Sequence, residues 1–186
     1  CGAAGVRALP HVTLLCLNAS TLNICSATMN NPYPSRKILD HRGPVSVCTT
    51  DTVYFITIAA KERGTTALID NAEAILASAR FYQRTMKWFL YLFLIMPDHI
   101  HMLVHIPPER TLADVIGHWK SFLATQHDIR FQVNFFDTRI RDQEHFAEKW
   151  NYICRNPVAK GLVKTAREWQ HSIAFDQETG LERQHR

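Results

Sequence analysis

The spacing of apolar residues predicts a series of short β-strands in the second part of the chain. Residues 53–59 (VYFITIA) are β-branched and aromatic and alternate approximately, as in a strand with one buried face. Residues 86–95 are almost continuously apolar, which is typical of a central strand buried on both faces. Pro97 and Asp98 mark a turn before a further strand at residues 100–106. Two weaker segments follow: a loop with a short strand within residues 131–140, and an edge strand or coil at residues 169–175.

Between these strands, apolar residues recur with the 3.6-residue period of amphipathic helices. Asp70 and Glu73 have the spacing of a capping box at the start of the first helix. Pro157 is expected to stop the last helix, because proline has no backbone N–H. The helices are predicted to run from Asp70 to about Arg84, from Thr111 to about His127, and from a cap at Asp142 to Asn156. This order of elements predicts an α+β fold in which helices cover one face of an antiparallel sheet.

Composition separates a central domain from two flanking segments. Residues 1–35 are rich in Ala, Asn, Ser, Thr and Pro and carry almost no charge, so we expect a poorly ordered or incidental extension. The domain is predicted to cover residues 36–175, and residues 176–186 form a polar C-terminal tail. The hydrophobic content of 46% is sufficient for a globular core.

Charge and cysteine content narrow the class of protein only moderately. The formal charge of +4 is compatible with binding to nucleic acid without being diagnostic of it. The longest apolar runs are far too short to span a bilayer, so no membrane segment is expected. The five cysteines are scattered and odd in number, which indicates reduced thiols and a cytoplasmic protein.

The most informative strand residues are His99 and His101, which are separated by one residue. On a strand, residues i and i+2 point to the same face, so the two imidazoles stand side by side and can share one metal ion. Such a pair alone is more often two half-buried strand histidines. His105 shares that face but lies about 13 Å from His101 along a strand, too far to share the ion.

The last helix carries a second group of chemically active side chains. Tyr152 lies nearly opposite the apolar stripe of this helix, and Asn156 and His145 share its side, with Lys149 beside them. An off-core tyrosine is usually only a surface residue. Together with the histidine pair, however, Tyr152 supplies a nucleophile and Asn156 a third neutral ligand. This set suits cleavage of a DNA phosphodiester with Mg²⁺ or Mn²⁺, in which the phenol retains the phosphoryl group as a covalent ester.

Two motifs resemble those of a known family. MPDHIHMLV (residues 96–104) and YICRNPVAKGLV (residues 152–163) resemble the REP-associated tyrosine transposases, relatives of the single-tyrosine HUH transposases. The resemblance implies a ferredoxin-like fold and a metal site of His99, His101 and Asn156. It also implies that Tyr152, on a C-terminal helix, cleaves and rejoins single-stranded hairpin DNA through a 5′-phosphotyrosine. Two departures from the family pattern are Asp98, where Asn is common, and the order Ala159-Lys160, where Arg-Ala is common.

Basic residues around the last helix are candidates for contacts with DNA phosphates. They are Arg139, Arg141, Arg155 and Lys160, and the alternative for each is a solvated surface charge. Two other functions remain open from the sequence. One is a protein that binds hairpin nucleic acid without cleaving it, and the other is a metal-dependent hydrolase of a small phosphoester. The sequence is compatible with either a monomer or a homodimer.

Overall fold

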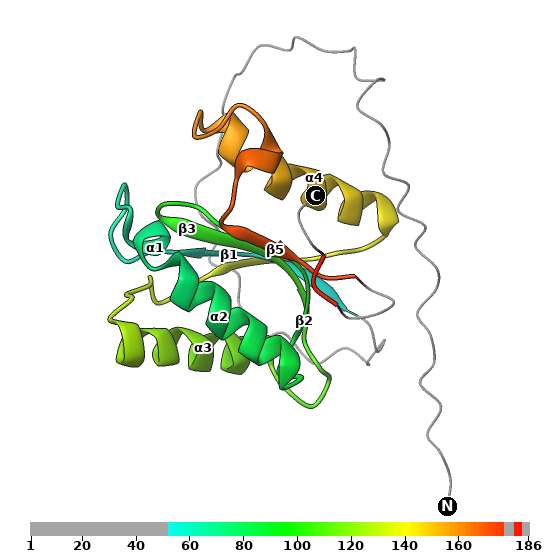
Figure 1. Ribbon diagram of the computed structural model, residues 1–186. Helices are drawn as coiled ribbons and strands as arrows, with labels where there is room; N and C mark the ends of the chain where they lie inside the picture. The colour runs from blue at the N-terminus through cyan, green and yellow to red at the C-terminus, as the bar shows by residue number, and fades with distance from the viewer. Residues whose placement is uncertain (1–51, 177–180, 184–186) are drawn as a thin grey trace, which may run out of the picture. The chain divides into compact units, whose positions relative to one another are not determined.

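The computed structural model describes residues 52–176 and 181–183, which form a five-stranded sheet with helices on both faces (Figure 1). The strands lie in the order β4-β1-β3-β2-β5, and every neighbouring pair is antiparallel. Their bounds are β1 Val53–Ala59, β2 Phe89–Ile95, β3 His99–His105, β4 Phe136–Arg139 and β5 Ser172–Ala174. The first four strands therefore have the order of a ferredoxin-like βαββαβ unit, with β5 added at one edge.

Helices α2 and α3 cover one face of the sheet, and α4 covers the other (Figure 1). The helical segments are α1 Ala67–Asp70, α2 Ala72–Arg84, α3 Leu112–His127 and α4 Gln143–Ala159, followed by the 3₁₀ turn η1 Ala166–Glu168. Helices α3 and α4 begin at the N-cap residues that the sequence predicts. Thr111 accepts a hydrogen bond from the N–H of Asp114, and Asp142 accepts one from the N–H of His145.

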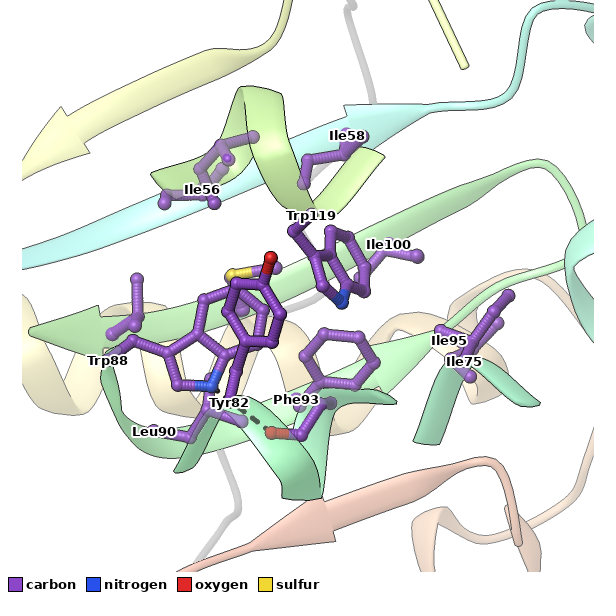
Figure 2. Packing of buried hydrophobic residues seen from close by; sticks show 14 of the residues in the cluster. Ile56, Ile58, Ile75, Tyr82, Trp88, Leu90, Phe93, Ile95, Ile100 and Trp119 are labelled. Atoms are coloured by element: carbon purple, nitrogen blue, oxygen red, sulfur yellow. Dashed lines mark hydrogen bonds between the residues drawn. The ribbon is translucent and has the colours of Figure 1, made fainter. Parts of the chain in front are cut away.

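The larger apolar core lies between the sheet and helices α2 and α3. Figure 2 shows Trp119 of α3 packed near Phe93 of β2 and Trp88, with Tyr82 of α2 beside them. The two indoles satisfy their polar groups inside the core: Trp119 Nε1 donates to Ser78 Oγ at 3.0 Å, and Trp88 Nε1 donates to the carbonyl of Ala79 at 3.2 Å. Buried polar atoms without such partners would destabilise the fold.

A smaller apolar cluster lies on the opposite face, beneath α4. Phe146 and Ile153 of α4 pack against side chains that alternate with those of the larger core, including Phe55 of β1 and Leu103 of β3. The main contacts of α4 with the sheet are to β2 and β3. Trp169 closes this cluster and donates from Nε1 to the carbonyl of Ile95 at 3.0 Å. The sheet therefore has two buried faces, and α4 is fixed on the second.

The predicted α+β class and antiparallel sheet are confirmed, with one difference in the layers. The placement of helices on one face holds for α2 and α3, whereas α4 lies on the other face. The physical reason is that β1, β2 and β3 present apolar side chains on both faces, so the apolar stripe of α4 has a surface of its own to cover.

Two predicted helix boundaries are wrong. The capping box at Asp70 does not form, because Asp70 ends α1 and accepts a hydrogen bond from the Thr66 hydroxyl, while Asn71 is the N-cap of α2. Pro157 does not stop α4, which continues to Ala159. A proline this close to the C-terminus removes only one intrahelical hydrogen bond, and its ring is buried.

The flanking segments are described only in part. The predicted extension at residues 1–35 and the predicted start of the domain at residue 36 lie outside the described residues. In the predicted tail, residues 181–183 return to the domain, where Glu182 pairs with Phe175 in a β-bridge and accepts two hydrogen bonds from Arg80 at 2.7 Å each. Within residues 52–176 and 181–183, no helix is both long and apolar enough to cross a membrane.

The packing around Trp119 leads to a prediction about stability. Trp119 is fully buried and contacts Trp88, Phe93 and Phe131. Trp119→Ala should therefore lower the free energy of unfolding by about 3–5 kcal/mol in urea titrations. Phe122 lies on the same helix but is 43% exposed, so Phe122→Ala should change it by about 0.5 kcal/mol or less. Equal effects of the two substitutions would contradict this account of the core.

Candidate active site

His99 and His101 project from β3 toward α4 and meet at their outer ring nitrogens. The Nε2 atoms of the two imidazoles are 3.1 Å apart. His101 is only 3% exposed, and His99 is partly exposed at the beginning of the strand. The predicted sharing of one strand face is thus seen directly, and the two rings are close enough to contact one small ligand.

Each imidazole is held in position through its inner nitrogen. His99 Nδ1 donates to Asp98 Oδ1 at 2.7 Å, because a carboxylate can only accept. His101 Nδ1 bonds to the Thr57 hydroxyl on β1 at 2.9 Å. The β1–β3 pairing places Thr57 directly opposite His101. Both rings are therefore oriented by a partner behind them, with Nε2 directed into the site.

Asn156 of α4 reaches the same point from the other side. Its side-chain amide donates from Nδ2 to His101 Nε2 at 3.0 Å, and the residue is 7% exposed. This bond leaves the proton of neutral His101 on Nδ1, where Thr57 accepts it. Rotation of the amide by half a turn would present its oxygen at the same place.

Tyr152 lies one helical turn before Asn156, beside the histidines. Its ring centroid is 5.3 Å from that of His101 and 5.9 Å from that of Phe55. The residue is 49% exposed, so a substrate can approach it from solvent. The sequence placed Tyr152 nearly opposite the apolar stripe. In the structure it lies at the margin of the sheet-facing side, whose buried residues are Phe146, Ile153, Asn156 and Pro157.

Burial keeps the two imidazoles neutral. It lowers the pKa of His101 to about 3, with a further contribution from the charge of His99. Burial also lowers the pKa of His99, while its hydrogen bond to Asp98 opposes this effect. For Asp98 itself, burial favours the protonated form, but the hydrogen bonds from His99 and the Gly64 N–H and the charge of Arg63 give a net lowering of its pKa. At neutral pH the site therefore contains two neutral imidazoles backed by one carboxylate.

The donor set fits a divalent cation. With both imidazoles protonated on Nδ1, their Nε2 atoms lie 3.1 Å apart, and a cation beside them could bind both once the Asn156 amide presents its oxygen in place of its N–H. An amide oxygen from Asn156 would complete three neutral ligands, and substrate oxygens could supply the rest. Within the described part of the chain, no group of three or more His, Cys, Asp or Glu side chains is placed to hold a metal, so this mixed set depends on Asn156.

The four basic residues predicted to contact DNA lie in different places. Lys160 is exposed and close enough to His99 for its charge to lower the pKa of that imidazole, and Arg155 is exposed on α4. Arg141 is exposed between β4 and α4. Arg139 pairs with Tyr54, so its side chain belongs to the α2/α3 face and not to the face with the histidines.

His105, which was not expected to be a ligand, bonds to the carbonyl of Thr52 at 3.1 Å.

Three residues at the site were missed by the sequence interpretation. Thr57 orients His101, Phe55 stacks on that ring at 5.6 Å, and Arg63 forms an ion pair with Asp98 at 3.2 Å. Phe55 and Thr57 lie on one strand, and only their pairing register with β3 brings them beside the histidines. Arg63 precedes Gly64, whose N–H also bonds to Asp98. The alternation of the β1 sequence would have indicated the shared face of Phe55 and Thr57, but not their partners.

The chain is similar to proteins of one transposase family. The family model described as Transposase IS200 like matches residues 48–151, a range that includes both histidines and ends one residue before Tyr152. A Haemophilus influenzae protein, provisionally named a REP-associated tyrosine transposase, is 26% identical over 144 residues, covering 67% of this chain and 80% of the relative. A solved REP-associated tyrosine transposase bound to a REP hairpin has a TM-score of 0.61 at 19% identity, covering 66% of this chain and 76% of that one. The structural similarity supports the fold.

The role of Asp98 leads to a prediction about proton positions in the metal-free protein. We expect long-range ¹H–¹⁵N NMR spectra near pH 8 to show His99 and His101 protonated on Nδ1. In Asp98→Ala, His99 should shift toward a mixture of tautomers, because the acceptor of its Nδ1 proton is lost. His101, held by Thr57, should keep its tautomer. A His99 tautomer unchanged by Asp98→Ala would show that the carboxylate does not orient this ring.

Proposed function

The chain belongs to the IS200-like transposase family, and from this premise we propose that it is a metal-dependent single-strand DNA transposase that cleaves and rejoins hairpin DNA through Tyr152. The observation that carries the proposal is the convergence of four side chains. Tyr152 and Asn156 come from α4, His99 and His101 come from β3, and each of them contacts at least one of the others. A nucleophile beside three neutral ligands suits phosphoryl transfer.

In the proposed reaction, the Tyr152 hydroxyl attacks the phosphorus of a DNA phosphodiester. A bond forms between the phenolic oxygen and phosphorus, and the bond from phosphorus to the 3′-oxygen breaks. The phenolic proton passes to solvent, and the departing 3′-oxygen takes up a proton to become a 3′-hydroxyl. Because the product is a 5′-phosphotyrosine ester, a 3′-hydroxyl of another strand can reverse the step and restore a phosphodiester.

His99, His101 and Asn156 would hold Mg²⁺ or Mn²⁺. When bound, the ion would polarise a phosphate oxygen and stabilise the charge that develops on it. The chain's own contribution is to prepare that place: Asp98 and Thr57 orient the two imidazoles, and burial keeps His101 unprotonated. Losing such orienting partners typically weakens metal affinity or activity by about 10–100-fold.

We propose hairpin DNA as the substrate, because the structural neighbour is bound to a REP hairpin. Lys160 and Arg155 are the best placed of the predicted phosphate contacts, and Arg63 joins them because it lies beside Asp98 and is 60% exposed. Arg141 remains a candidate, whereas Arg139 would require DNA to reach the α2/α3 face. One chain supplies the whole set of Tyr152, both histidines and Asn156, so a monomer would be sufficient for cleavage.

The assignment of the nucleophile is tested by trapping the covalent intermediate. Incubation with labelled hairpin-forming single-stranded DNA and Mn²⁺ should give a protein–DNA adduct that survives denaturing electrophoresis. Tyr152→Phe should abolish the adduct, because it removes the only atom that attacks phosphorus. Tyr54→Phe is the matched control, since Tyr54 is a tyrosine of strand β1 that packs toward the α2/α3 core and away from the site. An adduct that persists in Tyr152→Phe would overturn the assignment.

Removal of the proposed ligands tests the metal site without relying on activity. His99→Ala, His101→Ala and Asn156→Ala should each weaken Mn²⁺ binding by about 10-fold or more in calorimetric titrations. His105→Ala should leave binding unchanged, because His105 is engaged with the Thr52 carbonyl. Equal Mn²⁺ affinity in His101→Ala and the unsubstituted protein would contradict the site.

The same experiments distinguish the two other candidate functions. A protein that binds hairpins without cleaving them would form no adduct and would bind DNA equally well in His99→Ala. A hydrolase of small phosphoesters would release product from such an ester and would not require Tyr152. Neither alternative is favoured by an observation at the site, where Tyr152 lies against His101.

A further inference from the structure

A large aromatic side chain is exposed on the sheet face that carries the histidines. Phe136 is the first residue of the edge strand β4 and is 52% exposed. Its register partner is Thr57, so its side chain projects from the same face as Thr57 and His101. The main sheet contacts of α4 are to β2 and β3, and the helix does not bury Phe136. Leaving so much apolar area in water has no stabilising effect on the fold.

A single residue separates Phe136 from His101 on β3, and another separates it from Tyr152 on α4. Thr57, directly opposite Phe136, bonds to His101. Phe55, the diagonal neighbour of Phe136 across the strands, contacts the ring of Tyr152. Diagonal neighbours have Cβ atoms roughly 7–8 Å apart, and the backbones of β4 and β3 are separated by about 10 Å. About three stacked nucleotides, or fewer in an extended strand, would therefore span from Phe136 to the strand that carries the histidines.

A cation lies beside Phe55, the buried diagonal neighbour of Phe136. Lys149 Nζ is 5.8 Å from the centroid of the Phe55 ring, and its partner Glu148 is itself largely exposed. Alternating cations and exposed aromatic rings are the recurring features of surfaces that bind single-stranded nucleic acid, where the cation contacts phosphate and the ring stacks on a base.

We propose that Phe136 is a stacking site for an unpaired base of the DNA strand held at Tyr152. The proposal rests on the proposed function for its ligand, and it adds a contact that positions the strand. The base stacks on the exposed ring of Phe136 while Lys149 contacts a neighbouring phosphate, so the scissile phosphate is held between this site and the histidines. Because every base has an apolar face, the contact selects for unpaired bases over paired ones and not for a sequence.

The test measures binding apart from cleavage. Fluorescence anisotropy of a labelled hairpin oligonucleotide with unpaired flanks is followed for Tyr152→Phe protein, with and without Phe136→Ala. Phe136→Ala should weaken binding about 5- to 150-fold, the effect expected for the loss of one base stack. Phe136→Trp, which keeps a stacking surface, should retain most of the affinity. Phe122→Ala is the matched control, since Phe122 is an exposed phenylalanine on α3 at the other face.

A set of oligonucleotides with one abasic site each distinguishes stacking from a general structural effect. One abasic position in the unpaired flanks should weaken binding to the protein with Phe136 and have no further effect on Phe136→Ala. Unchanged affinity in Phe136→Ala would overturn the proposal. It would also be overturned if Phe136→Ala weakened binding by the same factor for the intact oligonucleotide and for every abasic one. A changed oligomeric state with unchanged DNA affinity would also overturn it, and would assign the β4 edge to self-association.

The proposed function is tested separately with the same oligonucleotide. If the unsubstituted protein forms the Tyr152 adduct but Phe136→Ala binds normally, only the stacking site is wrong. If no adduct forms but Phe136→Ala still weakens binding and removes the effect of the one abasic position, the base-binding site is supported and the proposed cleavage chemistry is wrong.

Discussion

The pairing of β3 with β1 is the interaction on which the proposed site depends. This ladder places Thr57 opposite His101 and Ala59 opposite His99, so both imidazoles lie on one face and one of them receives its orienting hydroxyl from the neighbouring strand. A shift of one residue in this register would send both histidines to the α2/α3 core. The apolar residues that alternate with them, Ile100 and Met102, are fully buried in that core and oppose any such shift.

The second constraint is the docking of α4 over the same face. Phe146 and Ile153 bury the helix against the sheet, and this packing brings Asn156 to His101 and leaves Tyr152 at the margin. Burial also lowers the pKa of His101 to about 3, so the imidazole is neutral at neutral pH. Packing thus determines both the geometry of the proposed site and the unprotonated imidazole that binding of a metal ion would require.

Local signals in the sequence were sufficient for much of the fold. The bounds of β1, the caps Thr111 and Asp142, and the turn at Pro97 and Asp98 all follow from residues within a few positions of one another. The face covered by α4 could not be predicted, because a helical wheel gives only the direction of an apolar stripe and not the surface that it meets. For the same reason the wheel placed Tyr152 too far from the sheet. Asp70 failed as a cap because a short helix, α1, precedes α2 and ends at that residue.

The shared metal site of His99, His101 and Asn156 is best tested with a crystal of the protein soaked in Mn²⁺ and measured at a wavelength where manganese scatters anomalously. We expect one strong peak within bonding distance of the Nε2 atoms of His99 and His101 and the side-chain oxygen of Asn156, with the Tyr152 hydroxyl beside it. Absence of a peak at this place, with the histidines and Asn156 still bonded to one another, would rule out the proposed metal site.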